Sequence, residues 1–274
     1  MFEDAFHCTP PRVLRLNRLC FKIACMQDRD SLWSLPPEIL KAARDEVHVW
    51  LLTLDQSPSY IQGLTTVLSE DEQNRANRFH FKKDHDHFIV ARGTLRIILG
   101  RYLRVKPERL RFSYTYYGKP ALEKEFEGES LRFNLSHSHG LALLGVTRDR
   151  EIGVDIERIR PGMADEQIPE RFFSDKEVGV LRGLPRQLQD EAFFNCWTRK
   201  EAYIKARGEG LSMPLALFDV TLVPGEPAAL LETRGEPLES SRWALRALVT
   251  EADFAAAIAV EGNDWSLRCW RWRA

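Results

Sequence analysis

The sequence lacks the features that mark a membrane or secreted protein. Its 274 residues contain no apolar run near the roughly 20 residues that a membrane-spanning helix needs. The five cysteines form no C-x-x-C pair, and an odd number in a chain this long is typical of reduced, cytoplasmic thiols. Prolines and basic residues interrupt positions 1–28, so no secretory signal is expected. These absences predict a soluble, cytoplasmic protein without a membrane partner.

An excess of charge of one sign is also missing. The formal net charge is −1, which by itself says nothing about a polyanionic partner; we expect no nucleic-acid partner. Charge is nevertheless uneven, because twelve lysines and arginines stand against four acids between Glu72 and Pro120. Opposite an acidic site, such a basic stretch fits a small polyphosphate ligand, although a solvated helical face explains it equally well.

Several catalytic motifs are absent as well. There is no G-x-x-x-x-G-K-[ST] loop, no kinase set, no G-x-S-x-G elbow and no H-E-x-x-H pair. The segment Asn134–His139 (NLSHSH) therefore leaves three readings: a hydrolase Ser–His pair, a zinc site, or an anion pocket at a strand end. The third is favoured, with Ser136 and His137 contacting a phosphate, because neighbouring residues rarely orient a nucleophile and the zinc spacing is missing.

What the sequence does contain is a pair of acids in an apolar run. Gly153–Glu157 (GVDIE) predicts a strand, and Asp155 and Glu157 then project from the same side because side chains alternate along a strand. Taken alone, such a pair is common with both acids simply in water.

A second acidic residue pattern follows some forty residues later. Trp197–Ala206 (WTRKEAYIKA) predicts a helix on which Trp197, Glu201 and Lys205 share one stripe. Alone, Glu201 and Lys205 could be an ordinary helical ion pair. If this stripe meets the acidic strand, three carboxylates converge beside a lysine, an arrangement suited to a hard divalent cation and a phosphate-bearing substrate.

The order of predicted elements indicates a duplicated α+β fold. Residues 1–45 are expected to be a poorly ordered extension with one short helix near Pro37–Arg44. Capping boxes at 69–72 and 174–177 each precede a long helix, Phe88–Leu103 and Glu191–Arg207. We therefore expect two similar halves, 46–152 and 153–274, each with helices packed on an antiparallel sheet and a site between them.

The strands and one turn complete the prediction. The turn is expected at 117–120, between Gly and Pro. Strands are expected at 47–54, 131–135, 141–146, 152–157, 218–222, 243–248, 254–260 and 265–272, with a bend at 136–140.

Five motifs together resemble a known family. GKPAL (118–122), FNLSHS (133–138), GVDIE (153–157), RFFS (171–174) and WTRKEAYIKARGEGLS (197–212) are similar, in the same order and spacing, to the 4′-phosphopantetheinyl transferases of the surfactin-type (Sfp-type) class. The resemblance covers about residue 47 to the C-terminus. It implies the pseudo-duplicated fold of that family and a monomer with coenzyme A between its halves.

The resemblance also implies an activity and a set of site residues. The activity is that of a holo-[acyl-carrier-protein] synthase type transferase, which moves phosphopantetheine from coenzyme A to a serine of an apo acyl or peptidyl carrier protein and releases 3′,5′-ADP. Asp155, Glu157 and Glu201 would bind magnesium, or manganese in its place. Glu201 would also act as the base and Lys205 would stabilise the leaving pyrophosphate. Ser136, His137, Lys119 and Arg75 would hold the nucleotide. Glu72 and His87 stand where some members carry basic residues.

Two rival functions remain open at this point. One is a non-catalytic module that binds coenzyme A or carrier proteins, against which the presence of all three carboxylates argues. The other is a different magnesium-dependent phosphotransfer enzyme, which the missing nucleotide loops make less favoured.

Overall fold

The computed structural model describes residues 32–210 and 213–274, so the predictions for residues 1–31 lie outside the described part. Its helices are α3 (Pro58–Thr65), α4 (Glu70–Ala76), α5 (Lys82–Leu103), α6 (Ile168–Phe172), α7 (Asp175–Gly183), α8 (Arg186–Arg207) and α9 (Glu239–Arg242). None of these helices has both the length and the apolar character to cross a membrane.

Most strands belong to two sheets. One has the order β11-β1-β5-β4 and the other β6-β10-β9, while β2 pairs with β3 and β7 with β8. The strands are β1 (Glu46–Thr53), β2 (Phe112–Tyr114), β3 (Pro120–Leu122), β4 (Leu131–Ser138), β5 (Leu141–Arg148), β6 (Ile152–Arg158), β7 (Phe218–Val220), β8 (Leu230–Thr233), β9 (Trp243–Ala247), β10 (Phe254–Glu261) and β11 (Ser266–Arg271). Helices and largely antiparallel sheets confirm the α+β class.

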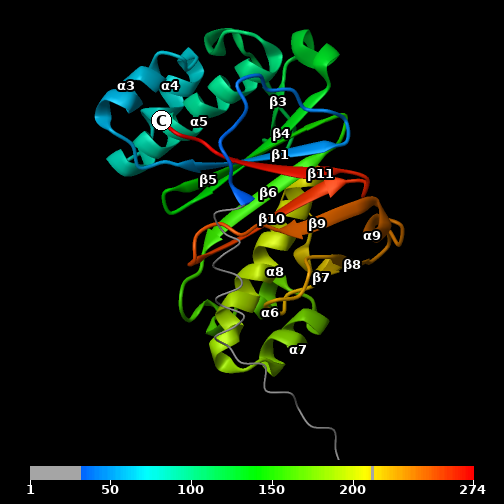
Figure 1. Cartoon of the computed structure of the whole chain (residues 1–274). Helices are drawn as coiled ribbons and strands as arrows, with labels where there is room; N and C mark the ends of the chain where they lie inside the picture. The colour runs from blue at the N-terminus through cyan, green and yellow to red at the C-terminus, as the bar shows by residue number, and fades with distance from the viewer. Residues whose placement is uncertain (1–31, 211–212) are drawn as a thin grey trace, which may run out of the picture.

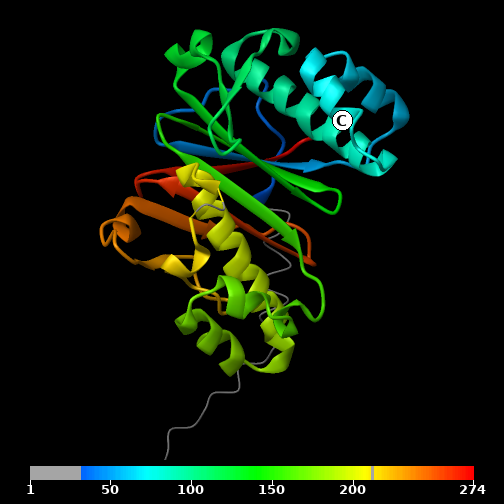
Figure 2. The ribbon, with the colours of Figure 1, turned by 180° about the vertical axis from the view of Figure 1, so that it is seen from behind.

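The elements stack in four layers: α5, the β11-β1-β5-β4 sheet, the β6-β10-β9 sheet and α8. Figures 1 and 2 show this order from opposite sides. Alternating residues explain the stacking. On β1, Val49 and Leu51 pack against β6 and β10 between the sheets, whereas Trp50 and Leu52 face the helical layer that includes α5. The outer face of β10 is lined by alanines, which join the core formed with α8. Each sheet thus buries both of its faces.

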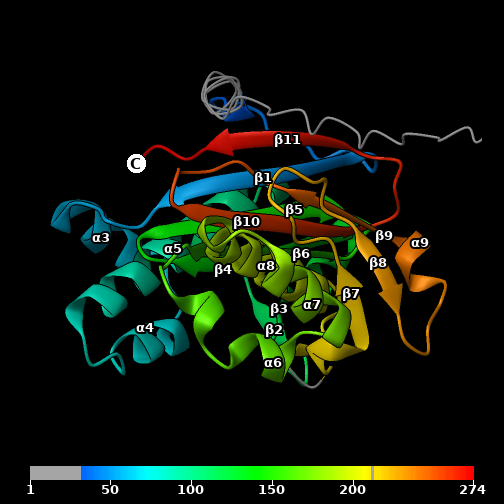
Figure 3. The same ribbon diagram turned by 90° about the horizontal axis from the view of Figure 1, so that it is seen from below.

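One strand departs from the predicted division into halves. β11, the last strand of the chain, pairs in parallel with β1, with Val49 opposite Cys269, and so belongs to the sheet of the N-terminal half. Figure 3 shows the two strands running side by side. The pairing covers the edge of β1, which would otherwise offer unpaired backbone groups to solvent. The sheet is therefore not purely antiparallel, and the boundary at 152/153 stays a prediction.

The predicted short helix at Pro37–Arg44 is wrong, because this segment forms bends and a turn. The carbonyl oxygens of Pro37 and Glu38, which a helix would use internally, accept hydrogen bonds from the Arg101 guanidinium at 3.0 Å each. Leu40 and Ala42 are buried in the core between α5 and the sheet that contains β1. Tertiary contacts thus replace helical hydrogen bonds here.

The predicted capping boxes are present at the starts of α4 and α7. At the second, the backbone N–H of Ser174 donates to Glu177 and the N–H of Glu177 donates back to the Ser174 hydroxyl. Both long helices begin several residues before their predicted starts, and β4 continues through Ser138, which reduces the expected bend to a turn at His139 and Gly140.

Candidate active site

The site lies where α8 crosses β6. On β6, Gly153, Asp155 and Glu157 share the face toward the helix, as the strand alternation predicts. A Cβ on Gly153 would lie 2.0 Å from the carbonyl oxygen of Ala202 and 2.4 Å from the backbone nitrogen of Ala206. The absence of a side chain at Gly153 therefore allows the helix to lie directly on the strand.

This close crossing brings the predicted residues into one cleft. A hollow of about 360 Å³ is lined by Leu135, Ser136, His137, Asp155, Glu157, Trp197, Glu201 and Lys205. Six of the eight predicted site residues are in this set, contributed by β4, β6 and α8. The convergence proposed from strand and helix periodicity is therefore present in the structure.

A lysine ammonium links two of the residues that line the cleft. Lys205 Nζ lies 2.6 Å from Asp155 Oδ1 and 3.0 Å from Ser136 Oγ, and Ser136 donates its hydroxyl hydrogen to the same Asp155 oxygen at 2.8 Å. Although burial disfavours the ammonium, the Asp155 carboxylate raises the pKa of Lys205 above its ordinary value. Lys205 is therefore held as a cation beside Asp155.

Ionisation of the remaining carboxyl groups of the cleft is disfavoured. Burial, together with the charges of Asp155 and Glu157, raises the pKa of Glu201 to about 7. Burial and the Asp155 charge also raise the pKa of Glu157. Asp155 Oδ2 is buried without a hydrogen-bond partner. A cation bound here would favour the ionised forms of Glu157 and Glu201 and would give Asp155 Oδ2 a partner.

The carboxylates do not already form a complete metal cage. Within residues 32–210 and 213–274, no group of three or more His, Cys, Asp or Glu side chains is arranged as a ready metal site. The Lys205 ammonium binds the Asp155 oxygen that a shared cation would approach.

Two predicted nucleotide contacts lie outside the cleft. Arg75 lines a separate hollow of about 570 Å³ with Asp71, Arg78, Phe79 and Tyr114. The Lys119 ammonium binds Glu151 at 3.0 Å and the backbone carbonyl oxygens of Ile152 at 3.3 Å and Ala206 at 3.1 Å. Lys119 thus ties the 115–119 turn to the end of α8 and the start of β6.

The two positions that depart from the family pattern have structural partners. Glu72 is buried, and its carboxylate accepts hydrogen bonds from the Nε groups of Arg92 and Arg96 at 2.5 Å each. His87 lies 2.7 Å from Asp55. Glu72 therefore neutralises two arginines of the basic stretch.

Residues around the cleft fix the orientation of α8. Lys200 is fully buried, with its ammonium 2.8 Å from Glu177 and 2.8 Å from the carbonyl oxygen of Leu215. Trp197 packs against Phe172 and Phe193. These contacts give both residues a packing role, and Glu201 rather than Lys200 lines the cleft.

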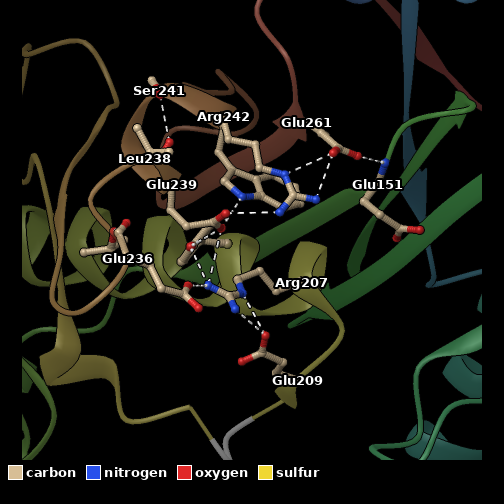
Figure 4. A network of polar contacts seen from close by, with 12 residues as sticks. Glu151, Arg207, Glu209, Glu236, Leu238, Glu239, Ser241, Arg242 and Glu261 are labelled. Carbon is tan, nitrogen blue, oxygen red and sulfur yellow. Dashed lines mark hydrogen bonds and ion pairs between the residues drawn. The ribbon is translucent and has the colours of Figure 1, made fainter.

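A polar network anchors the end of the same helix (Figure 4). Glu239 accepts hydrogen bonds from Tyr203 at 3.1 Å, Trp243 at 2.7 Å and Arg207 at 3.3 Å. Arg207 also binds Glu209, just beyond the helix. Tyr203 and Arg207 lie roughly opposite Glu201 and Lys205 on the helix, so the network holds the face that does not line the cleft. Sequence reasoning did not identify Glu239, because no local motif links it to α8.

The cleft thus combines carboxylates, a lysine and a serine–histidine strand end, a set suited to transfer of a phosphorus-containing group. Comparison with known proteins agrees with this class. Residues 151–259 match the family model of the 4′-phosphopantetheinyl transferase superfamily, and residues 55–147 match that of the 4′-phosphopantetheinyl transferase N-terminal region.

Individual relatives extend over most of the chain. The 4′-phosphopantetheinyl transferase HetI of Nostoc sp. strain PCC 7120 is 42% identical over 240 residues, covering 88% of this chain and 98% of HetI. The Sfp transferase of Bacillus subtilis strain 168 is 32% identical over 157 residues, covering 57% of this chain and 67% of Sfp. The L-aminoadipate-semialdehyde dehydrogenase-phosphopantetheinyl transferase of Pongo abelii is 29% identical over 230 residues. The match covers 76% of this chain and 72% of that transferase.

A solved structure described as the Chronobacterium ammoniagenes ACPS–CoA complex is also similar in part. It is 24% identical, covers 42% of this chain and 98% of its own, and has a TM-score of 0.31, which is too low to carry an argument. On the sequence comparisons, the chain belongs to the 4′-phosphopantetheinyl transferase superfamily. It is an enzyme of the transferase type.

Proposed function

We propose that this enzyme transfers the 4′-phosphopantetheine arm of coenzyme A to a serine of an apo acyl or peptidyl carrier protein, releases 3′,5′-ADP and depends on magnesium. The observation that carries the proposal is the single cleft that holds Ser136, Asp155, Glu157, Glu201 and Lys205. Membership of the superfamily supports the transferred group.

Glu201 is proposed as the base. Serine is a poor nucleophile until a base takes its proton, and a general base is most effective when its pKa lies near the operating pH. In the cation-free protein the cleft raises the pKa of Glu201 to about 7, and a bound cation would lower it and leave Glu201 ionised to accept the proton. Within the described residues, the Glu201 carboxylate has no hydrogen-bond partner, so it is available to a serine, directly or through water.

Lys205 and the β4 residues are proposed to hold the phosphates. The Lys205 ammonium would turn from Asp155 toward the pyrophosphate and stabilise charge on the departing 3′,5′-ADP. Ser136 and His137, which line the same cleft, would contact the 3′-phosphate. Arg75, with Arg78 beside it, would hold the nucleotide from the neighbouring hollow. A nucleotide contact by Lys119 requires its ammonium to leave Ala206 and Glu151.

The residues present fit a magnesium ion. Asp155, Glu157 and Glu201 would hold it, and the buried, unpartnered Asp155 Oδ2 and the raised pKa values of the two glutamates support this assignment. When bound, a divalent cation neutralises charge that develops on the pyrophosphate. We also propose that the enzyme is a monomer and that it is cytoplasmic; the two free, buried cysteines of the described part fit a reducing compartment.

Mass spectrometry of a carrier protein tests the proposal. The protein is incubated with coenzyme A, magnesium and a panel of apo carriers, and both carrier mass and 3′,5′-ADP are followed. The proposal predicts a mass gain of one phosphopantetheine on at least one carrier, and no gain with Asp155→Ala or Glu201→Ala, both of which remain folded. Magnesium-dependent binding of coenzyme A without turnover on any carrier would instead indicate a binding module.

A further inference from the structure

The two sheets meet at the site through side chains. β4 and β6 belong to different sheets, and alternate residues of β4 reach across to β6. Asn134 Oδ1 accepts the backbone N–H of Val154 at 2.9 Å, and Ser136 donates to Asp155 at 2.8 Å. Ser138, the third residue of this alternation, donates to Glu157 Oε2 at 2.8 Å.

The neighbours of Ser138 direct its hydroxyl hydrogen toward Glu157. It is 7% exposed, and its oxygen accepts the backbone N–H of Arg158 at 3.3 Å, which leaves its single hydrogen for Glu157. The Nδ1 of His139 lies 2.9 Å from the same oxygen and adds a second donor in its Nδ1–H tautomer. The Arg158 N–H, and His139 in that tautomer, therefore favour the orientation in which the Ser138 hydroxyl points at the glutamate.

Ser138 differs in this respect from Ser136. The Ser136 oxygen is shared between Asp155 and Lys205, and the proposed function places it on a phosphate. Ser138 is absent from the cleft lining, so it contacts the cleft only through Glu157.

We propose that Ser138 is a positioning residue for Glu157 in metal binding, an inference that rests on the proposed function. By holding Oε2, the hydroxyl fixes the long glutamate side chain and leaves Oε1 for the cation shared with Asp155 and Glu201. Partners that hydrogen-bond a ligating carboxylate typically contribute 10- to 100-fold to metal affinity.

Calorimetric titration of Mn²⁺ into the full chain, with excess coenzyme A, tests the inference. Ser138→Ala is expected to raise the Mn²⁺ dissociation constant by about 10-fold or more. Ser138→Thr, which keeps the hydroxyl, is expected to stay close to wild type. The control is Ser113→Ala, at an exposed serine of β2, which is expected to change nothing. Coenzyme A affinity measured without Mn²⁺ should be the same in all four proteins, a readout that general damage to the fold would alter.

Two outcomes separate this inference from the proposed function. If wild type binds Mn²⁺ and Ser138→Ala binds it equally well, the positioning role is wrong while the metal site stands. If wild type does not bind Mn²⁺ with coenzyme A present, the metal site itself is wrong. Should Ser138→Ala fail to fold, Ser138→Cys serves instead, because its thiol is similar in size and a weak donor; a wild-type dissociation constant in that variant would overturn the role.

Discussion

The Lys205 ammonium lies 2.6 Å from Asp155 Oδ1, at the point where the proposed function requires a shared divalent cation. The lysine therefore acts as the counter-charge of Asp155 in the cation-free protein. Binding of the cation and binding of the pyrophosphate are then coupled, because the phosphates attract Lys205 away from the carboxylate that the cation needs.

Replacing Lys205 is expected to affect cation binding and catalysis in opposite directions. Without coenzyme A, Lys205→Met should bind Mn²⁺ roughly tenfold more tightly, because a charge-assisted hydrogen bond no longer competes for Asp155. Transfer should fall by about 10²- to 10³-fold, since a group that stabilises the leaving oxygens is lost. Calorimetry and carrier mass measure the two effects. Lys176→Met, at an exposed lysine of α7, is the control. Weaker Mn²⁺ binding in Lys205→Met would contradict the competition.

Glu201 is expected to lower the stability of the cation-free enzyme. The folded-state pKa of about 7 lies above the ordinary value of 4.5, so the folded protein holds a proton that the unfolded chain has released between these values. Stability is therefore lost as pH rises from about 4.5 to 7. Glu201→Gln should raise the free energy of unfolding by roughly 2–3 kcal/mol at pH 8 in the presence of a chelator, and by little at pH 4.5.

Urea denaturation at the two pH values measures this effect. Glu191→Gln, at an exposed position of the same helix, is the matched control and should be neutral at both. An equal effect of Glu201→Gln at pH 4.5 and pH 8 would show that the carboxyl group is not held protonated by the cleft.

Gly153 sets the distance between α8 and β6. Gly153→Ala places a methyl group 2.0 Å from the Ala202 carbonyl oxygen, so the helix must shift. We expect a loss of about 1–3 kcal/mol in unfolding free energy and a large loss of transfer, because Glu201 moves away from Asp155. Gly179→Ala in α7, where nothing lies within 4 Å of the added Cβ, should retain full transfer. Transfer at the wild-type rate in Gly153→Ala would show that the close crossing is not needed.

His48 is expected to make the fold sensitive to acid. Burial lowers the pKa of His48 to about 4, with its ring between Tyr102 at 2.7 Å and Glu46 at 3.3 Å. The unfolded chain binds a proton below pH 6.5 while the folded chain does not, so stability falls as pH falls from 6.5 toward 4. His48 should account for about 2 kcal/mol of loss between pH 7 and 5. His48→Gln should flatten the pH dependence of urea midpoints over that range; parallel curves for both proteins would contradict this.

Local patterns predicted the essential geometry of the site. Strand alternation placed Asp155 and Glu157 on one face, and four-residue spacing placed Glu201 and Lys205 on one stripe. The crossing that joins them has a local signal too, since Gly153 faces Ala202 and Ala206, three residues with little or no side chain. The early starts of α5 and α8 were missed because their first turns are mainly polar and exposed, so hydrophobic periodicity is weak there.

Contacts between distant segments could not be predicted from such patterns. The contact of Lys119 with the Ala206 carbonyl oxygen could not be anticipated, because the two residues lie 87 positions apart in the sequence. The parallel pairing of β11 with β1 joins strands from near the two ends of the described chain. Nothing in the sequence of either strand predicts which strand it pairs with. Glu72 was identified only as a departure from the family pattern, because its partners Arg92 and Arg96, one turn apart on α5, lie 20 and 24 residues away in the sequence.

The most direct test is to locate Mn²⁺ by anomalous X-ray scattering in crystals grown with coenzyme A. The account predicts one peak within bonding distance of oxygens from Asp155, Glu157 and Glu201, with the Lys205 ammonium moved from Asp155 to the pyrophosphate. A peak that excludes Glu201, or a Lys205 still paired with Asp155 beside bound coenzyme A, would contradict it.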